Sequence, residues 1–124
     1  HNRVRRQRQM CIRDSMQSYN VMGVAKAALE TSIKYLAVDM GDRGIRVNAI
    51  SAGPMRTLAG AVINKSRQIY NYTIDNSPIK KPLSLEDIGK SSVYLMSDLS
   101  KGVTGEILYV DNGYNNVGMS IQDL

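Results

Sequence analysis

Residues 45–57 read IRVNAISAGPMRT, and this stretch decides the fold class. The run Ile45–Ser51 is rich in β-branched residues, which favours a strand. Ala52-Gly53-Pro54 then ends the strand, because proline removes an amide donor. Gly53 is expected to adopt backbone geometry that is closed to other residues. The segment therefore predicts one strand of a sheet that stops at a sharp turn.

A helix is predicted immediately upstream, from Met16 to about Met40. Its apolar and small residues recur at spacings of three and four, as on one helix face. Gly41 and Gly44 are expected to cap its end. Helix, tight turn and strand make the second half of a βαβ unit, which favours a parallel sheet. The face consists of Val21, Val24, Ala25, Ala28, Leu29, Ser32, Ile33, Leu36 and Ala37.

Downstream, the pattern over residues 57–76 predicts one or two short helices. Ser84 followed by Glu86 and Asp87 predicts another helix, with a hydroxyl N-cap and acids in the first turn. Its expected apolar face is Ile88, Ser92, Leu95 and Met96.

A turn is predicted at Gly102–Gly105, followed by the apolar strand Ile107–Val110, of the kind buried on both faces of a parallel sheet. The element order predicts an α/β fold, the C-terminal part of a Rossmann-type doubly wound parallel sheet. No Gly-rich turn from strand to helix occurs in the chain, so the usual pyrophosphate cradle is not expected here.

The 124 residues are enough for one small domain, expected over residues 16–124. Residues 1–15 hold five arginines and one acid, and without them the net charge falls from +5 to +1. We expect this stretch to be a non-native or disordered tail rather than an arm that binds nucleic acid, since aromatic stacking residues are missing. No apolar run suggests a membrane span or signal peptide. The lone Cys11 fits a reducing compartment, and no metal is expected.

Tyr19 and Lys26 are the candidate catalytic residues. Seven helical positions are close to two turns, so both side chains leave one face, about 10 Å apart along the axis. The lysine ammonium would lower the cost of negative charge near the phenol and make it a better proton donor. Such a pair suits proton delivery to an oxyanion or enolate, although it also arises by chance in many helices.

The surrounding motifs make the interpretation specific. A Tyr-x6-Lys helix followed by R-V-N-x-I-x-x-G resembles the short-chain dehydrogenase/reductase superfamily. The fuller stretches YNVMGVAKAALE, RVNAISAGPMRTLA, SDLS-x-GVTGE and YVDNGYNNVGM resemble the bacterial NADH-dependent enoyl-acyl-carrier-protein reductases. The resemblance covers about residues 18–119. It implies reduction of a trans-2-enoyl thioester in cytoplasmic fatty acid biosynthesis, a substrate carried on acyl carrier protein, and a homotetramer.

The resemblance also implies roles by position. Tyr19 contacts the thioester carbonyl and steadies the enolate, and Lys26 bonds the nicotinamide ribose of NADH. Pro54 and two isoleucines of the following helices, Ile63 and Ile69, would contact the substrate. The segment expected to lie against the cofactor is Met55, Arg56, Thr57, Leu58 and Ala59.

Two departures from the family pattern matter. The family has a second tyrosine about ten residues before Tyr19, where this chain has Gln9. The cofactor-binding half that carries the Gly-rich turn is also missing from the chain. We therefore expect the chain to be a C-terminal fragment that is inactive by itself.

Alternatives remain open at this point. A different short-chain dehydrogenase, such as a 3-oxoacyl-acyl-carrier-protein reductase, would use a serine upstream of the tyrosine, and none stands near the expected slot at Arg6–Arg8. A non-catalytic assembly fragment is a further alternative. The small residues Gly23, Ala27 and Ala28 would suit close helix packing within or between subunits.

Overall fold

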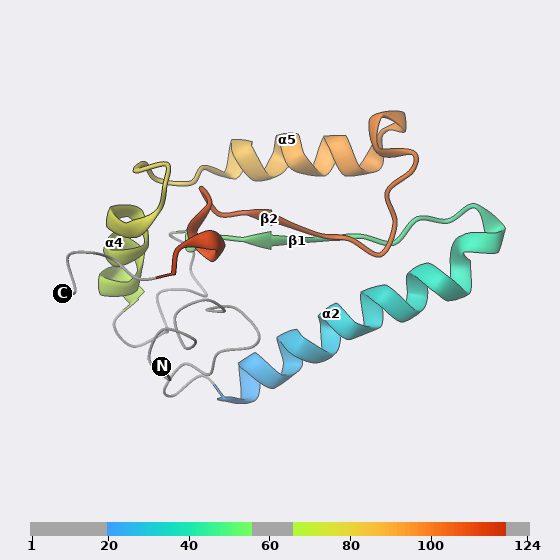
Figure 1. Ribbon diagram of the computed structural model, residues 1–124, viewed down its shortest axis with the longest axis horizontal. Coiled ribbons are helices and arrows are strands. Elements are labelled where there is room, and N and C mark those ends of the chain that lie inside the picture. The colour runs from blue at the N-terminus through green and yellow to red at the C-terminus, as the bar shows by residue number, and fades with distance from the viewer. Residues whose placement is uncertain (1–19, 56–65, 119–124) are drawn as a thin grey trace.

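The computed structural model describes residues 20–55 and 66–118, and predicted features in other parts of the chain lie outside the described residues. The described elements alternate between helices and strands, with short 3-10 helices (η) at three turns (Figure 1). In chain order they are α2 (Asn20–Met40), η1 (Gly41–Arg43), β1 (Ala49–Ala52), α4 (Ser66–Asn76), α5 (Leu85–Met96), η2 (Asp98–Ser100), β2 (Ile107–Val110) and η3 (Tyr114–Asn116).

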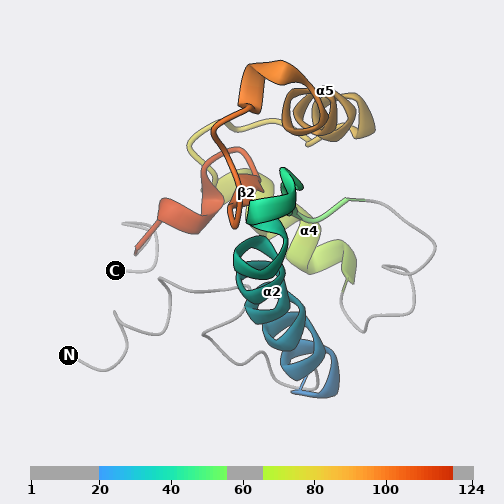
Figure 2. The same cartoon turned by 90° about the vertical axis from the view of Figure 1, so that its right-hand side faces the viewer.

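The two strands form a parallel pair that lies between helices. The register runs from Ala49 opposite Ile107 to Ala52 opposite Val110. Helix α5 packs on both strands from one side, and α2 lies on the opposite side of the sheet (Figures 1 and 2). The predicted α/β class and parallel pairing are confirmed. Parallel pairing matters for function because both strands end at the same edge.

Strand β1 is shorter than predicted, since it begins at Ala49 and not at Ile45. The residues before it are held by side chains as well as by backbone bonds. The Val47 amide donates to Thr104 Oγ1 at 3.0 Å. The Asn48 side chain donates to the Val103 carbonyl at 2.9 Å and accepts from the Glu106 amide at 3.1 Å. The Thr104 and Asn48 side chains therefore add to the backbone bonds of this stretch, which run from the Gly105 amide to the Val47 carbonyl at 2.7 Å and from the Ala49 amide to the Glu106 carbonyl at 2.9 Å.

Arg46 ties the entry of β1 to the segment that follows α5. Its Nη1 donates to Ser100 Oγ at 2.9 Å and to the Ser100 carbonyl at 3.0 Å. It also reaches the Val103 carbonyl at 3.3 Å, while Nη2 donates to the Ser97 carbonyl at 3.3 Å. Ser100 is only 1% exposed. One guanidinium thus donates to three carbonyls of a tight turn, two of which also accept backbone amides.

Helix α2 ends as predicted, but its predicted apolar face shares only Ile33 and Ala37 with the positions that are buried or half-buried. Gly44 has φ 72°, a left-handed conformation, and its amide bonds the Gly41 carbonyl at the C-cap of η1. The predicted face is largely exposed: Val21 is 80% and Val24 is 71% exposed. The buried and half-buried positions of α2 form a stripe at helical spacing: Gly23, Ala27, Glu30, Ile33, Ala37 and Met40.

None of the helices within residues 20–55 and 66–118 is long and apolar enough to cross a membrane.

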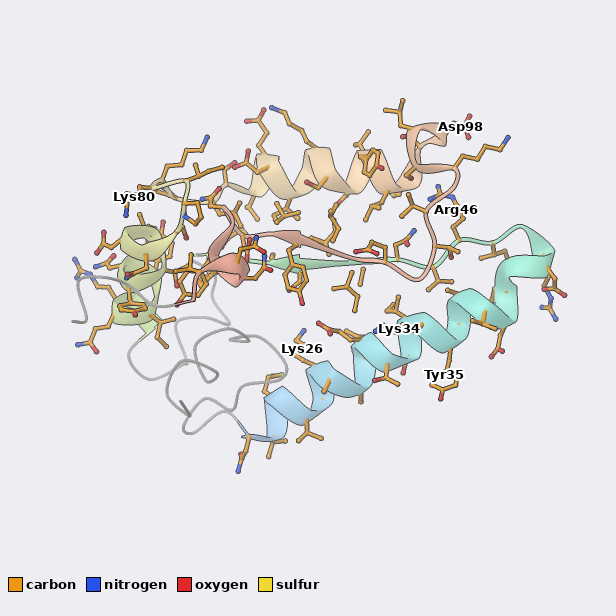
Figure 3. All side chains as sticks on the ribbon, in the orientation of Figure 1. Lys26, Lys34, Tyr35, Arg46, Lys80 and Asp98 are labelled. Atoms are coloured by element: carbon orange, nitrogen blue, oxygen red, sulfur yellow. The ribbon has the colours of Figure 1, made fainter. Side chains whose placement is uncertain are left out.

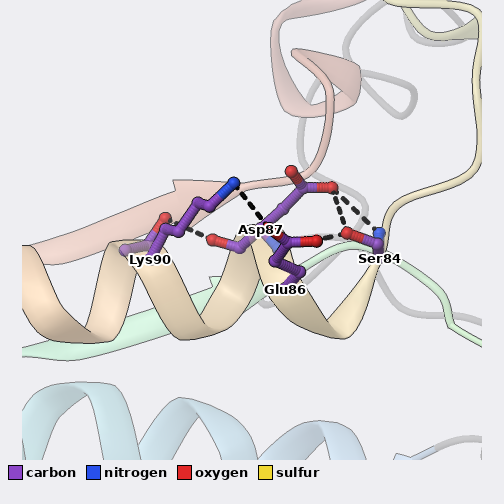
Figure 4. Close-up of polar contacts among 5 residues, drawn as sticks. Ser84, Glu86, Asp87 and Lys90 are labelled. Carbon is purple, nitrogen blue, oxygen red and sulfur yellow. Dashed lines mark hydrogen bonds and ion pairs between the residues drawn. The ribbon is translucent and has the colours of Figure 1, made fainter.

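Helix α5 begins with the predicted Ser84 cap, which is a full capping box (Figure 4). Ser84 Oγ accepts from the Asp87 amide at 3.1 Å, and the Asp87 carboxylate accepts from the Ser84 amide at 3.0 Å. Hydrogen bonds from the Ser84 hydroxyl and amide hold the pKa of the Asp87 carboxyl below its ordinary value. Neighbouring Glu86 instead pairs with Lys90 at 2.7 Å on the exposed side.

Two burial expectations are wrong. Met96 belongs to the predicted apolar face of α5 but is 76% exposed. Strand β2 pairs in parallel as predicted, yet Tyr109 is 45% exposed, so the strand is not buried on both faces among the described residues. A two-stranded sheet has two edges and covers less of each strand than a wide sheet does.

Replacing Asp87 with alanine is expected to lower stability at neutral pH and to lose that effect in acid. The folded-state pKa of Asp87 is depressed, so its contribution is present above the unfolded pKa of about 3.9 and fades as the pH falls below it. Urea unfolding at pH 7 and pH 3 measures this. Glu86→Ala is the matched control, since an exposed i,i+4 pair contributes little. If the free energies of unfolding of wild type and Asp87→Ala differed equally at both pH values, the stabilising role of the ionised Asp87 carboxylate would be contradicted.

Candidate functional site

The two strands deliver their following loops to one edge of the sheet. After β1 comes Gly53-Pro54-Met55, and after β2 comes the turn Asp111–Asn116. The Gly53 amide continues the ladder by donating to the Val110 carbonyl at 2.9 Å. Ligands of open α/β sheets bind beyond the carboxyl ends of the strands, so this edge is the candidate site.

A glycine is required at position 53 because a side chain would not fit there, and not because the backbone conformation demands one. It is buried, and the positive-φ glycines among the described residues are at other positions, so the expectation of an unusual backbone is wrong. A Cβ built on Gly53 would lie 3.0 Å from Asp111 Cα and 3.1 Å from Asp111 Cβ. The two strand ends therefore touch backbone to backbone, which only a residue without a side chain permits.

Asp111 organises the turn that follows β2. Its Oδ1 accepts from the Gly113 amide at 3.0 Å and its Oδ2 from the Asn115 amide at 2.8 Å. The Asn115 side chain adds a weaker contact at 3.3 Å. The Asp111 residue is 8% exposed. A carboxylate that accepts two backbone amides is a strong local clamp, since charge-assisted hydrogen bonds exceed neutral ones.

The end of helix α4 lies against the same edge. Thr73 and Ser77 are 6% and 2% exposed, respectively. Thr73 Oγ1 donates to the Ile69 carbonyl at 2.9 Å, and Ser77 Oγ donates to the Thr73 carbonyl at 2.6 Å. A crevice of about 10 Å³ separates these two residues from Pro54 and Asp111. That volume holds about one water molecule, so α4 packs closely on the loop after β1.

The connection from α4 to α5 is tied to the turn after β2. The Ile79 amide donates to the Asn112 carbonyl at 3.2 Å. Asn112 Nδ2 donates to the Lys81 carbonyl at 2.7 Å. Asn112 has φ 58°, a left-handed conformation that asparagine tolerates better than most residues. The connection is therefore fixed by both the backbone and the side chain of one residue.

Lys26 is the described member of the predicted catalytic pair. It is exposed and lies on α2, as predicted. Its side chain extends from the side of α2 that faces the sheet, whereas Tyr35 points away from the sheet (Figure 3). Tyr19 immediately precedes the first residue of α2 in the sequence and lies outside the described residues.

The other predicted site residues fall into two groups. Pro54 and Met55 follow β1 at the carboxyl edge, and Ile69 is half-buried on α4, one turn before Thr73. Pro54 and the end of α4 line the same crevice, so these regions are brought together. Outside the described residues lie Arg56, Thr57, Leu58, Ala59 and Ile63.

Sequence reasoning missed Asp111, Asn112 and Thr73 as parts of this edge. The signal for the first two was present, because Asp-Asn-Gly after a predicted strand is a turn sequence, and it follows the second of two parallel strands. Thr73 carried no such signal. Its burial depends on where α4 packs, which periodicity alone does not fix.

Comparison with known proteins gives a consistent result. A family model described as Enoyl-(Acyl carrier protein) reductase matches residues 9–115. An enoyl-[acyl-carrier-protein] reductase [NADH] 2 of Rhizobium meliloti is 62% identical over 104 residues, which are 84% of this chain and 39% of that protein. The chain thus spans about two fifths of the length of the curated relatives it matches.

Solved structures agree. The crystal structure of FabI from Candidatus Liberibacter asiaticus aligns with TM-score 0.83 and 57% identity, covering 90% of this chain and 43% of that one. An enoyl-(acyl-carrier-protein) reductase from Anaplasma phagocytophilum, solved in complex with NAD, aligns with TM-score 0.80 and 53% identity over 87% of this chain and 41% of that one. The predicted Rossmann-type α/β fold is confirmed.

Replacing Gly53 with alanine is expected to destabilise the protein by about 1–3 kcal/mol, the usual cost of overpacking, because the new methyl group would meet Asp111 backbone at 3.0 Å. Gly89→Ala in α5 is the matched control, since nothing lies within 4 Å of the position its methyl group would take and alanine favours helices. Chemical unfolding of both variants measures the difference. Equal stability of the two variants would refute a close approach at Gly53.

Proposed function

The chain belongs to the enoyl-(acyl carrier protein) reductase family, and we propose that it forms part of an enzyme that reduces trans-2-enoyl thioesters to saturated acyl thioesters. The observation that carries the proposal is the family match over residues 9–115. NADH, when bound, supplies the hydride for the β-carbon of the substrate. The substrate is carried on acyl carrier protein, in cytoplasmic fatty acid biosynthesis.

Lys26 is proposed to hold the cofactor. Its ammonium is exposed and extends from the sheet-facing side of α2 (Figure 3), where it can donate hydrogen bonds to ribose hydroxyls. Met55 and the residues after it, Arg56, Thr57, Leu58 and Ala59, are proposed to lie against the nicotinamide and its phosphates. The position of Met55 at the carboxyl edge of a parallel sheet supports this assignment.

Tyr19 is proposed to donate a hydrogen bond to the thioester oxygen as negative charge develops there. Stabilising charge where it appears in the transition state is usually the largest catalytic effect. Lys26 supports the phenol electrostatically, since its positive charge lies on the helix face that a residue seven positions earlier would share.

The acyl chain is proposed to contact Pro54, Ile63 and Ile69. Pro54 offers a rigid surface at the end of β1, and Thr73 of α4, one turn after the half-buried Ile69, lines the same crevice as Pro54. Helix α4 therefore acts as one wall of the substrate site, and the loop after β1 acts as the other.

In the full-length protein, Tyr19→Phe is expected to lower kcat about 100-fold or more, the loss typical of one oxyanion donor, and Lys26→Met is expected to raise KM for NADH. Tyr35→Phe and Lys34→Met are matched controls on α2, because both residues are exposed. NADH oxidation with crotonyl thioester measures this, and the present chain alone is expected to show none. Preferential turnover of acetoacetyl thioester would instead identify a 3-oxoacyl reductase.

We further propose that the full-length protein is a homotetramer that uses the outer side of α2. Val24 and Tyr35 are 71% and 70% exposed, and Val21 and Val38 are 80% and 79% exposed. Eleven residues are about three helical turns, so Val24 and Tyr35 share one side, each with a valine three positions away. An apolar stripe of this kind marks an interaction surface.

Val24→Glu combined with Val38→Glu is expected to reduce the assembly size, because each carboxylate would be buried without a partner in an apolar interface. Light scattering of the full-length protein measures the mass. Lys101→Glu places the same group at an exposed position outside α2 and serves as the control. An unchanged mass for the double variant would exclude this side as an interface.

A further inference from the structure

We propose that Asp111 and Asn112 are positioning residues with separate duties in this enzyme: Asp111 fixes the cofactor-side segment Pro54–Met55, and Asn112 fixes the end of α4 beside the acyl chain. Neither residue is proposed to touch substrate or cofactor. The inference rests on the proposed function, because it assumes that these two segments serve NADH and the acyl chain.

The duty of Asp111 follows from a direct backbone contact. Its carboxylate clamps the turn through the Gly113 and Asn115 amides. Its Cα is within 3.0 Å of the position a Cβ on Gly53 would take. No flexible side chain lies between the two backbones, so a shift at Asp111 passes directly to Gly53 and then to Pro54–Met55.

The duty of Asn112 follows from where its hydrogen bonds go. Its side chain reaches the Lys81 carbonyl at 2.7 Å, and its carbonyl accepts from the Ile79 amide at 3.2 Å. Both partners lie in the connection that begins directly after α4. Gly113 adds a steric contact, since a Cβ there would be 3.0 Å from Pro78 Cγ. The two Asn112 hydrogen bonds therefore hold the end of α4 to the turn without the Asp111 carboxylate, whereas the Gly113 contact belongs to a residue that Asp111 clamps.

This division makes the two duties separable by substitution. Asp111→Asn keeps the side-chain shape but replaces one acceptor oxygen with a donor, so it opens the clamp on the cofactor side. Asn112→Gly keeps the left-handed backbone readily and removes only the bond to Lys81. Asn112→Asp gives a second version, because aspartate tolerates this backbone and cannot donate at neutral pH.

The test measures steady-state kinetics of the full-length enzyme with NADH and crotonyl thioester. Asp111→Asn is expected to raise KM for NADH about fivefold, the worth of one hydrogen bond, and to raise KM for the thioester by a smaller factor, because Pro54 of the shifted segment is proposed to contact the acyl chain. Asn112→Gly and Asn112→Asp are expected to give the reverse pattern. Exposed Asp98→Asn is the matched control and is expected to change neither constant.

An equal rise in both constants for each variant, or a lower melting temperature with unchanged KM values, would overturn the inference, because a purely structural role predicts those patterns. Should Asp111→Asn fail to fold, Asn115→Ala weakens the same clamp through its 3.3 Å contact and is expected to shift KM for NADH in the same direction. Absence of turnover by the wild-type enzyme would reject the proposed function instead, and NADH binding by fluorescence would still report on Asp111.

Discussion

The register of the parallel pair decides what meets at the candidate site. Ala52 lies opposite Val110, so the next residues on each strand, Gly53 and Asp111, also face each other. Slipping the pair by one residue would turn every side chain to the other face and would put Pro54 or Val110 into this contact. Proline lacks the amide that Gly53 gives to the Val110 carbonyl. The site geometry therefore depends on a four-residue ladder.

So short a ladder needs support at its other end, and polar side chains supply it. Asn48 bonds the Val103 carbonyl and the Glu106 amide with one side chain, directly before the ladder begins. Arg46 donates hydrogen bonds to the Ser100 and Ser97 carbonyls in the turn after α5. These bonds are part-buried, where loss of either partner leaves polar groups unsatisfied at a cost of about 1–3 kcal/mol. They specify the register as well as stabilising it.

The sequence allowed prediction of features whose cause is local. The Ser84 cap, the turn at Gly44 and the limits of β2 each depend on a few neighbouring residues, and the structure confirms them. The predicted start of β1 was wrong because the side chains of Asn48 and Thr104, 56 positions apart, take some of the hydrogen bonds that a regular ladder would make there. Most of the predicted apolar face of α2 is exposed, because the spacing of apolar residues does not show which side of a helix packs against the rest of the chain.

Both faces of helix α2 carry apolar or small residues. The inner stripe, with Ala27 and Ala37, faces the sheet. The Cβ of Ala37 lies 3.4 Å from the position that a Cβ on Gly105 would take. The outer stripe is apolar and exposed. Lys26 is polar and lies on the inner side, where a purely structural helix would favour another apolar residue. The place of Lys26 on the sheet-facing side of α2 supports its proposed role in holding the cofactor.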